Sequence, residues 1–164
     1  MITNNFSFED LTDKLSSLEP FAFARYGDGE WNAIFGKDGT NCDGHEYYKD
    51  MGKRLADIVQ SNPSYLMGMQ SLALRTQGDR IRSFLDANDI DIDWIDSDIL
   101  HHASMHGKLP EFFITLQNRD VVIIGPKHLK AMKRYIGDFN LIEVPAKNAW
   151  QIYHDLKARL SSDI

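Results

Sequence analysis

The feature that most constrains the fold is an apolar run in the last third of the chain, residues 121–126, with the sequence VVIIGP. A half-exposed strand would alternate apolar and polar side chains, so four consecutive β-branched residues indicate a strand that is buried on both faces. The glycine and proline end this strand in a turn. Apolar residues at helical spacing follow through Leu129, Met132 and Tyr135, which predicts a strand–turn–helix unit.

The same alternation recurs along the chain. Further strands are predicted at residues 21–26, 65–69 and 141–145. Helical spacing predicts helices at residues 8–18, 30–35, 48–59, 77–88 and 149–160, with one or two more between 96 and 117, broken near Gly107 and Pro110. Alternating strands and helices favour a mostly parallel sheet covered on both faces, so we expect an α/β fold. We expect one domain over residues 1–164, because no linker or repeat divides the chain.

Three turns are expected to meet at one edge of this sheet. Gly27 and Gly125 each follow a predicted strand, and so does the segment after Val144. Ligands of parallel sheets bind beyond the carboxyl ends of the strands. The sequence therefore predicts a binding site where these turns converge.

Composition excludes several classes of protein. Hydrophobic residues make up 43% and charged residues 26% of the chain, which is typical of a globular domain and not of a disordered one. No apolar run approaches the roughly 20 residues of a membrane span, and no basic and apolar leader pattern opens the sequence. Cys42 is the only cysteine, so we expect a cytoplasmic protein in a reducing compartment.

The charge distribution favours a local anion site over extended polyanion binding. The net charge is −6, whereas binding to a phosphate backbone needs clustered cations. Basic residues gather in the C-terminal third: Lys127, Lys130, Lys133, Arg134, Lys147, Lys157 and Arg159. A nucleotide diphosphate suits such a region better than a long duplex, although most of these side chains are also typical of solvated helix faces.

The most informative short motif places two carboxylates around a glycine, Asp28-Gly29-Glu30, directly after a buried strand. Mg²⁺ is commonly held by one or two carboxylates together with substrate phosphates. Arg25, three residues earlier, is expected to neutralise a phosphate or to pair with a carboxylate. The alternative is structural: Asp28 as a helix N-cap worth about 1 kcal/mol, with Glu30 complementing the helix dipole.

A second polar pattern lies in the middle of the chain. Asp98, His102 and His106 are spaced four residues apart and share one stripe if the segment is a continuous helix. Such a stripe can hold a metal ion or supply a general base. A polar helix face exposed to solvent explains the same spacing.

Two segments resemble the signatures of the GT-D-type glycosyltransferases. Residues 23–30, with the sequence FARYGDGE before a hydrophobic helix, are similar to the N-terminal signature of this family. Residues 144–150, VPAKNAW, with Tyr153 one turn later, are similar to its C-terminal Pro-x-x-Asn-Ala-aromatic segment, and residues 121–125 resemble its late strand and nucleotide loop. The chain is shorter than typical members, and the segment 90–116 matches no part of the pattern.

The resemblance implies a Rossmann-like fold, a nucleotide diphosphate sugar as donor, with a UDP-sugar expected, and a Mn²⁺ or Mg²⁺ ion held by Asp28 and Glu30. Arg25 or Lys147 would contact the phosphates. The expected nucleotide-sugar contacts are Gly27, Gly29, Gly125, Lys127, Lys147 and Asn148. Asn148 is equally well placed to cap the last helix.

Two other functions are compatible with the same residues. A metal-dependent phosphoesterase would share ions among Asp28, Glu30, His102 and His106, and an inactive nucleotide-binding module would keep the fold without turnover. The acceptor of a transferase is unidentified, with a glycan or a protein-linked glycan favoured and a nucleic acid as the alternative. The sequence is compatible with a homo-oligomer.

Overall fold

A three-stranded parallel sheet organises the N-terminal half of the computed structural model, which describes residues 5–17 and 21–162. Its strands are β1 (Phe23–Tyr26), β2 (Leu66–Met69) and β3 (Trp94–Asp96), in the order β1-β2-β3. The register aligns the last residues of all three strands, so their carboxyl ends form one edge. β3 was not predicted: residues 90–94, IDIDW, alternate apolar and acidic side chains, but this signal was overlooked among the acidic residues of the segment.

Six helices belong to this half and to its connection with the rest: α1 (Phe8–Ser16), α2 (Asp28–Ile34), α3 (Lys49–Gln60), α4 (Ser71–Ala87), α5 (Ile99–Met105) and α6 (Leu109–Gln117). α4 begins six residues before the predicted start at Gln77. The predicted break near Gly107 is confirmed, since this residue has φ +70° between α5 and α6. Pro110 instead lies in the first turn of α6, and the predicted helix end at Leu18 lies outside the described residues.

The C-terminal half contains a second, smaller sheet. β4 (Val122–Gly125) and β5 (Asn140–Glu143) pair in parallel, and a 3₁₀ helix, η1 (Lys127–Met132), and the short α7 (Lys133–Ile136) connect them. The chain closes with η2 (Ala149–Ile152) and α8 (Tyr153–Ser162). The chain is therefore mixed α/β with parallel strands, as expected. The expectation of one sheet was wrong, since the described strands form two.

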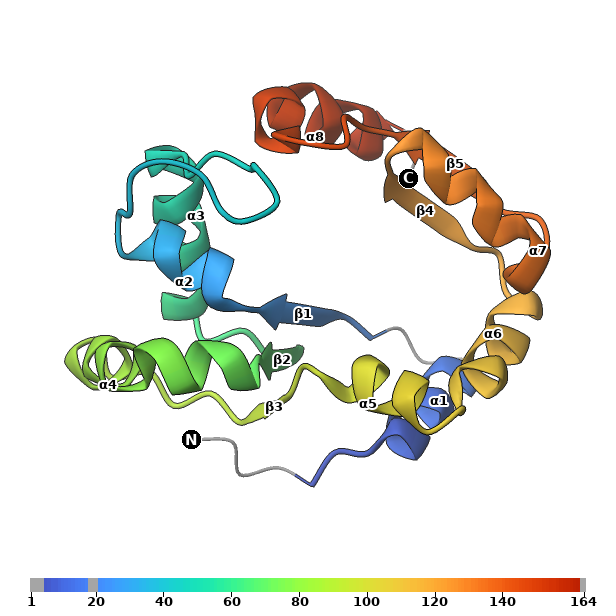
Figure 1. Ribbon diagram of the computed structural model, residues 1–164, viewed down its shortest axis with the longest axis horizontal. Helices are drawn as coiled ribbons and strands as arrows, with labels where there is room; N and C mark the ends of the chain where they lie inside the picture. The colour runs from blue at the N-terminus through green and yellow to red at the C-terminus, as the bar shows by residue number, and fades with distance from the viewer. Residues whose placement is uncertain (1–4, 18–20, 163–164) are drawn as a thin grey trace.

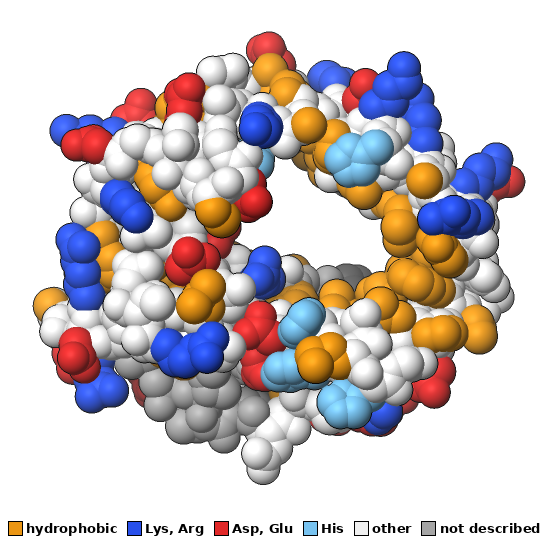
Figure 2. All heavy atoms as spheres, in the orientation of Figure 1, with side chains coloured by type: hydrophobic (Ala, Val, Ile, Leu, Met, Phe, Trp, Pro, Cys, Tyr) orange, Lys and Arg blue, Asp and Glu red, His pale blue; other side chains and the backbone are white. Residues whose placement is uncertain are grey.

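The two halves form an open ring (Figure 1). On one side, Phe8 and Leu11 of α1 pack with Ile99 and Ala103 of α5, and the following helix α6 packs against α7 of the other half. On the other side, the loop before α3 meets the segment before α8, where the Asn148 side chain accepts a hydrogen bond from the Glu46 amide. Figure 2 shows an opening through the centre of this ring. No helix in the described ranges is long and apolar enough to cross a membrane.

The main core lies between the three-stranded sheet and helices α2, α3 and α4. Trp31 and Trp94 are its largest buried side chains, and the Trp31 indole N–H donates to the Met69 sulfur at 3.2 Å. Tyr26 completes the cluster, with its ring centroid 6.1 Å from that of Trp31. Burial raises the pKa of the Tyr26 hydroxyl well above its usual range, because a phenolate inside this core would be unsolvated.

Helices α2 and α3 approach so closely that a side chain is excluded at one position. A Cβ atom added to Gly52 in α3 would lie 2.0 Å from the carbonyl oxygen of Ala33 in α2. This contact is with backbone and cannot be relieved by rotating a side chain. The close approach fixes α2, and with it the Asp28-Gly29-Glu30 turn, against the rest of the domain.

We expect Gly52→Ala to destabilise the protein by about 1–3 kcal/mol, because the two helices must move apart. Chemical denaturation monitored by tryptophan fluorescence measures this. Gly78→Ala in α4 is the matched control: no atom lies within 4 Å of its Cβ position, so the added methyl should stabilise the helix by roughly 0.5–1 kcal/mol. Equal effects of the two substitutions would contradict the close contact.

Candidate functional site

The first turn of α2 presents the Asp28-Gly29-Glu30 motif at the carboxyl edge of the three-stranded sheet. The N-cap is Gly27, and its amide donates to Glu30 Oε2 at 2.8 Å in a capping arrangement. Asp28 is the first helical residue, and its amide donates to Gln70 Oε1 at 3.3 Å. The structural role proposed for this motif is thus present, but Glu30 caps the helix and Asp28 does not.

The two carboxylates of the motif face different cavities. Asp28 lines a cavity of about 720 Å³ between α2 and α4. Gly29 and Glu30 line another, of about 590 Å³, between α2, α3 and the C-terminal segment. We call these the basic cavity and the aromatic cavity. The first turn of α2 therefore forms part of the wall of both.

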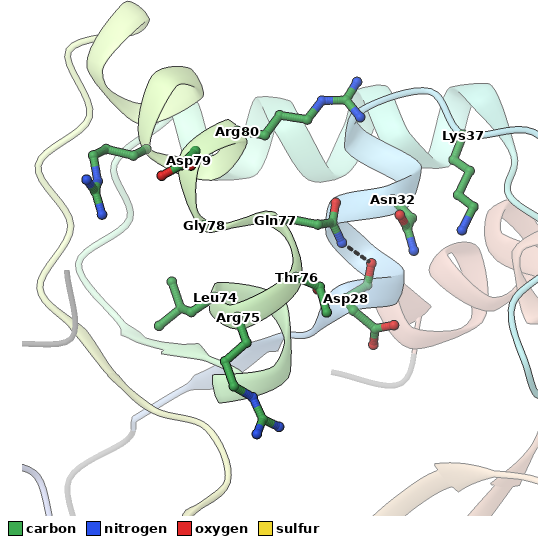
Figure 3. A pocket seen from close by; sticks show the side chains of 11 residues that line it. Asp28, Asn32, Lys37, Leu74, Arg75, Thr76, Gln77, Gly78, Asp79 and Arg80 are labelled. Carbon is green, nitrogen blue, oxygen red and sulfur yellow. Dashed lines mark hydrogen bonds between the residues drawn. The ribbon is translucent and has the colours of Figure 1, made fainter.

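The basic cavity combines several cationic side chains with few acidic ones (Figure 3). Its charged lining consists of Lys37, Arg75, Arg80 and Arg82 against Asp28 and Asp79. The Arg80 guanidinium is held at the rim, 4.2 Å above the Phe35 ring, and donates to the Phe35 carbonyl at 3.3 Å. Gln77 spans the cavity and donates to the Asp28 carbonyl at 3.3 Å. This cavity was not predicted, because Arg75 precedes the expected helix start at Gln77 and the other cationic side chains follow no motif in the sequence.

The aromatic cavity is lined by residues from two distant segments of the chain. Tyr47 and Tyr48 come from the loop before α3, and Trp150 and Tyr153 come from the start of the last helix. The Trp150 and Tyr153 rings stack at a centroid distance of 4.6 Å and an interplanar angle of 19°. The Gln151 amide donates to the Tyr48 hydroxyl at 2.8 Å. Partial desolvation and the neighbouring Glu46 carboxylate raise the pKa of Tyr48.

Asn148 connects these two ends. Its backbone is left-handed, with φ +57°, a conformation that Asn tolerates better than most residues. Its Oδ1 atom accepts from the Glu46 amide at 2.9 Å, and its side chain caps no helix. Lys147 lies against Gly44 and lines neither cavity. Asn148 thus occupies the N-cap position of η2 without a side-chain capping bond, and it lines the aromatic cavity.

Arg25 belongs to a polar network at the same sheet edge. Its guanidinium lies 3.9 Å from Asp98 Oδ1 and is 55% exposed. Asp98 Oδ2 accepts from both the amide and the hydroxyl of Ser71. The pairing with a carboxylate that was expected of Arg25 therefore exists, but with Asp98 and not with the Asp28-Gly29-Glu30 motif.

The stripe formed by Asp98, His102 and His106 is helical, as expected, because α5 carries it continuously from its N-cap to its C-cap. The nearest carboxylate of His102 is that of Asp96, with 3.4 Å between His102 Nδ1 and Asp96 Oδ2. His102, His106 and Asp96 line a third cavity of about 360 Å³. The histidines are thus separate from both carboxylates of α2.

Gly125 and Lys127 lie in the other sheet unit. Gly125 ends β4, and a Cβ atom there would lie 2.3 Å from a methyl group of Leu129, so a larger residue would require the Leu129 side chain to move. Lys127 is exposed at the start of η1. The expected convergence of Gly27 and Gly125 at one sheet edge is not found, because their strands belong to different sheets.

The two carboxylates expected to hold a metal ion line different cavities. Glu30 is engaged with the Gly27 amide, whereas Asp28 points into the other cavity. Across residues 5–17 and 21–162 there is no group of three His, Cys, Asp or Glu side chains arranged to hold an ion. Asp28 alone fits the minimal arrangement of one carboxylate completed by substrate phosphates.

Comparison with known proteins gives no match, whether to family models, to curated proteins or to solved structures.

We expect Glu30→Ala to lower the stability by about 1 kcal/mol, since it removes the acceptor of the Gly27 amide. Glu30→Gln keeps a carbonyl oxygen at the same place and should retain nearly the original stability. Thermal unfolding of the three proteins side by side measures the difference. An unchanged melting temperature in Glu30→Ala would show that the cap contributes nothing.

Proposed function

We propose that this chain is a glycosyltransferase that moves a sugar from a nucleotide diphosphate sugar to a polar acceptor. A UDP-sugar is the expected donor. The observation that carries the proposal is that the two segments resembling family signatures line one cavity: Gly29 and Glu30 from the first, and Asn148 and Trp150 from the second. They lie at opposite ends of the chain and meet at this cavity.

The chemistry of the aromatic cavity suits a sugar. A pyranose has apolar C–H faces and a rim of hydroxyl groups, and aromatic rings together with a few polar groups bind such surfaces. Trp150 and Tyr153 offer the rings. The second oxygen of Glu30 and the Arg54 guanidinium offer an acceptor and a donor for the hydroxyl groups.

The basic cavity suits the diphosphate. Glycosyl transfer leaves a nucleotide diphosphate, on which negative charge develops as the bond to the sugar breaks. Lys37 and Arg75 supply positive charge beside Asp28. Because the first turn of α2 borders both cavities, a donor lying across it would place its phosphates on one side and its sugar on the other.

Asp28 is the residue that we propose to bind a divalent cation. Mn²⁺ or Mg²⁺ bound to this carboxylate would take its other ligands from phosphate oxygens and water, and would neutralise the leaving group. Glu30 would then act through its cap, by fixing the turn that carries Asp28. Arg25, in contact with Asp98, would hold the turn after β3 against the end of β1.

The phosphoesterase alternative receives less support. It needs Asp28, Glu30 and the two histidines around shared ions, but these residues line three different cavities. The inactive nucleotide-binding module differs from the transferase only in turnover, so an assay of donor consumption separates them. We further propose a Rossmann-like arrangement of the strands and, from the single cysteine, a cytoplasmic location.

We expect a thermal-shift screen of UDP, GDP, CDP and ADP, with and without Mn²⁺ or Mg²⁺, to give a metal-dependent rise in melting temperature with UDP. A ligand at a hundredfold excess over its Kd adds about 2.7 kcal/mol. Asp28→Asn should abolish the metal dependence. Asp79→Asn, which changes another carboxylate of the same cavity, should not.

Trp150→Ala tests the sugar side of the same proposal. It should leave UDP binding nearly intact but weaken the extra stabilisation that a UDP-sugar gives over UDP. Consumption of the UDP-sugar by the unmodified protein, followed by chromatography, then separates a transferase from a binding module. No shift with any of the four nucleotides would overturn the proposal.

A further inference from the structure

The two cavities beside the first turn of α2 carry opposite charge. The basic cavity is lined by four Lys or Arg side chains and two carboxylates. The aromatic cavity is lined by three carboxylates, those of Glu30, Asp43 and Glu46, and by the guanidinium of Arg54, with His45 counted as neutral at pH 7. Cavity walls focus the field of the charges that they carry. The aromatic cavity therefore attracts a cation, whereas the basic cavity attracts an anion.

The carboxylates of the aromatic cavity have no cationic partner in the described part of the chain. No ion pair there involves Glu30, Asp43 or Glu46. The Lys147 ammonium lies against Gly44, in the same loop as Asp43 and Glu46, but it forms no ion pair with these carboxylates either. Their negative charge is consequently left for water or for a bound cation.

The aromatic rings of this cavity suit the same kind of ligand. A cation over the face of an aromatic ring is attracted by the quadrupole of the ring, and several rings together form a cage for an ammonium group. The Tyr47 ring already lies under a cation of the chain, the Lys37 ammonium, at 5.8 Å from the ring centroid. The rings of Tyr48, Trp150 and Tyr153 also line the cavity, and within the described residues none of them has such a partner.

Tyr48 connects these rings to a carboxylate. Its hydroxyl accepts a hydrogen bond from the Gln151 side chain at 2.8 Å. Desolvation and the neighbouring Glu46 carboxylate raise the pKa of Tyr48, so the phenol stays neutral at pH 7 and carries no charge of its own. A cation next to Tyr48 would therefore meet an aromatic face and the Glu46 carboxylate together.

We propose that the aromatic cavity binds a protonated amine, against the rings of Tyr48, Trp150 and Tyr153 and the carboxylate of Glu46. Resting on the proposed function, this amine belongs to the sugar that enters the cavity, so the substrate class is an amino sugar with a free ammonium group. The phosphates of the donor and the ammonium of the sugar would then lie on opposite sides of the α2 turn, each in the cavity of opposite charge.

Three sugars that share one ring test the charge requirement. D-Glucosamine carries an ammonium group, whereas D-glucose and N-acetyl-D-glucosamine are neutral. We expect glucosamine to bind with a Kd about tenfold lower than either neutral sugar. Titrations followed by ligand-observed saturation-transfer NMR, at about pH 6, where amines are protonated, measure the three values. Added NaCl should weaken the binding of glucosamine more than that of glucose.

Two results of these titrations would overturn the proposal. One is equal affinity for the three sugars, because the cavity would then recognise the ring without the charge. The other is the absence of binding by all of them. Choline, titrated in parallel, separates the two sources of an ammonium group. Binding of choline without binding of glucosamine would overturn the assignment to an amino sugar.

Variants locate the binding in this cavity. Glu46→Gln should lower the preference for glucosamine over glucose by about threefold. Asp57→Asn is the matched control, because it removes an exposed carboxylate of α3 that lines neither cavity, and it should keep the preference. Trp150→Phe retains a ring and should bind glucosamine, whereas Trp150→Ala should not. Since Glu46 is exposed, its variant decides the matter if Trp150→Ala fails to fold. An unchanged preference in Glu46→Gln would contradict the proposal.

The nucleotide screen keeps this inference distinct from the proposed function. A preference for glucosamine without any nucleotide-dependent thermal shift would support the ammonium site and count against the transferase. A thermal shift with UDP but no preference for glucosamine would support nucleotide binding and overturn the ammonium site.

Discussion

The packing of Trp31 is the interaction on which the rest of the site depends. Its indole is completely buried between the sheet and α4, with an N–H contact to the Met69 sulfur and ring contacts to Tyr26 and Trp94. Asp28 lies one turn earlier in the same short helix. Because the tryptophan cannot move without opening the core, the turn between the two cavities is held by apolar packing, and few polar bonds are needed to fix it.

Because Trp31 fixes the position of α2, the polar side chains at the carboxyl edge of the sheet have fixed partners. Each strand of the first sheet ends beside a different polar group, and the side chains of Gln70 and Ser71, at the end of β2, reach to the turns on either side. The Gln70 side chain accepts from the Asp28 amide, and the Ser71 hydroxyl donates to Asp98. The sheet edge is therefore already connected by hydrogen bonds, and the carboxylate that receives none of them within the described ranges is that of Asp28. This supports Asp28, over Glu30, as the group left for a ligand.

The sequence predicted features that depend on neighbouring residues, but it did not predict features that depend on contacts between distant segments of the chain. The strand within the run 121–126 and the break near Gly107 were correctly predicted, because β-branched side chains and a left-handed glycine act within a few residues. The expected burial of this strand on both faces was wrong, since Val122 and Ile124 are exposed. β3 was overlooked because Trp94 and Ile95 are buried by tertiary packing that their acidic neighbours conceal. The spacing of Asp28 and Glu30 suggested a shared ion, but residues two apart in one helical turn point to different sides of the helix, and the capping bond decides which way Glu30 faces.

The two sides of the aromatic cavity differ in how firmly they are held. Its inner wall, α3 against α2, rests on backbone contact at Gly52. Its outer wall depends on hydrogen bonds at exposed positions, from the Glu46 amide to Asn148 and from Gln151 to Tyr48. Exposed hydrogen bonds contribute little net stability, and segments held by them open at low cost. The cavity therefore has one rigid side, which carries Glu30, and one side that can separate, which carries Trp150. A ligand that stacks on Trp150 while contacting the α2 turn would connect the two sides, so the contacts that bind it would also hold the outer wall against the inner one.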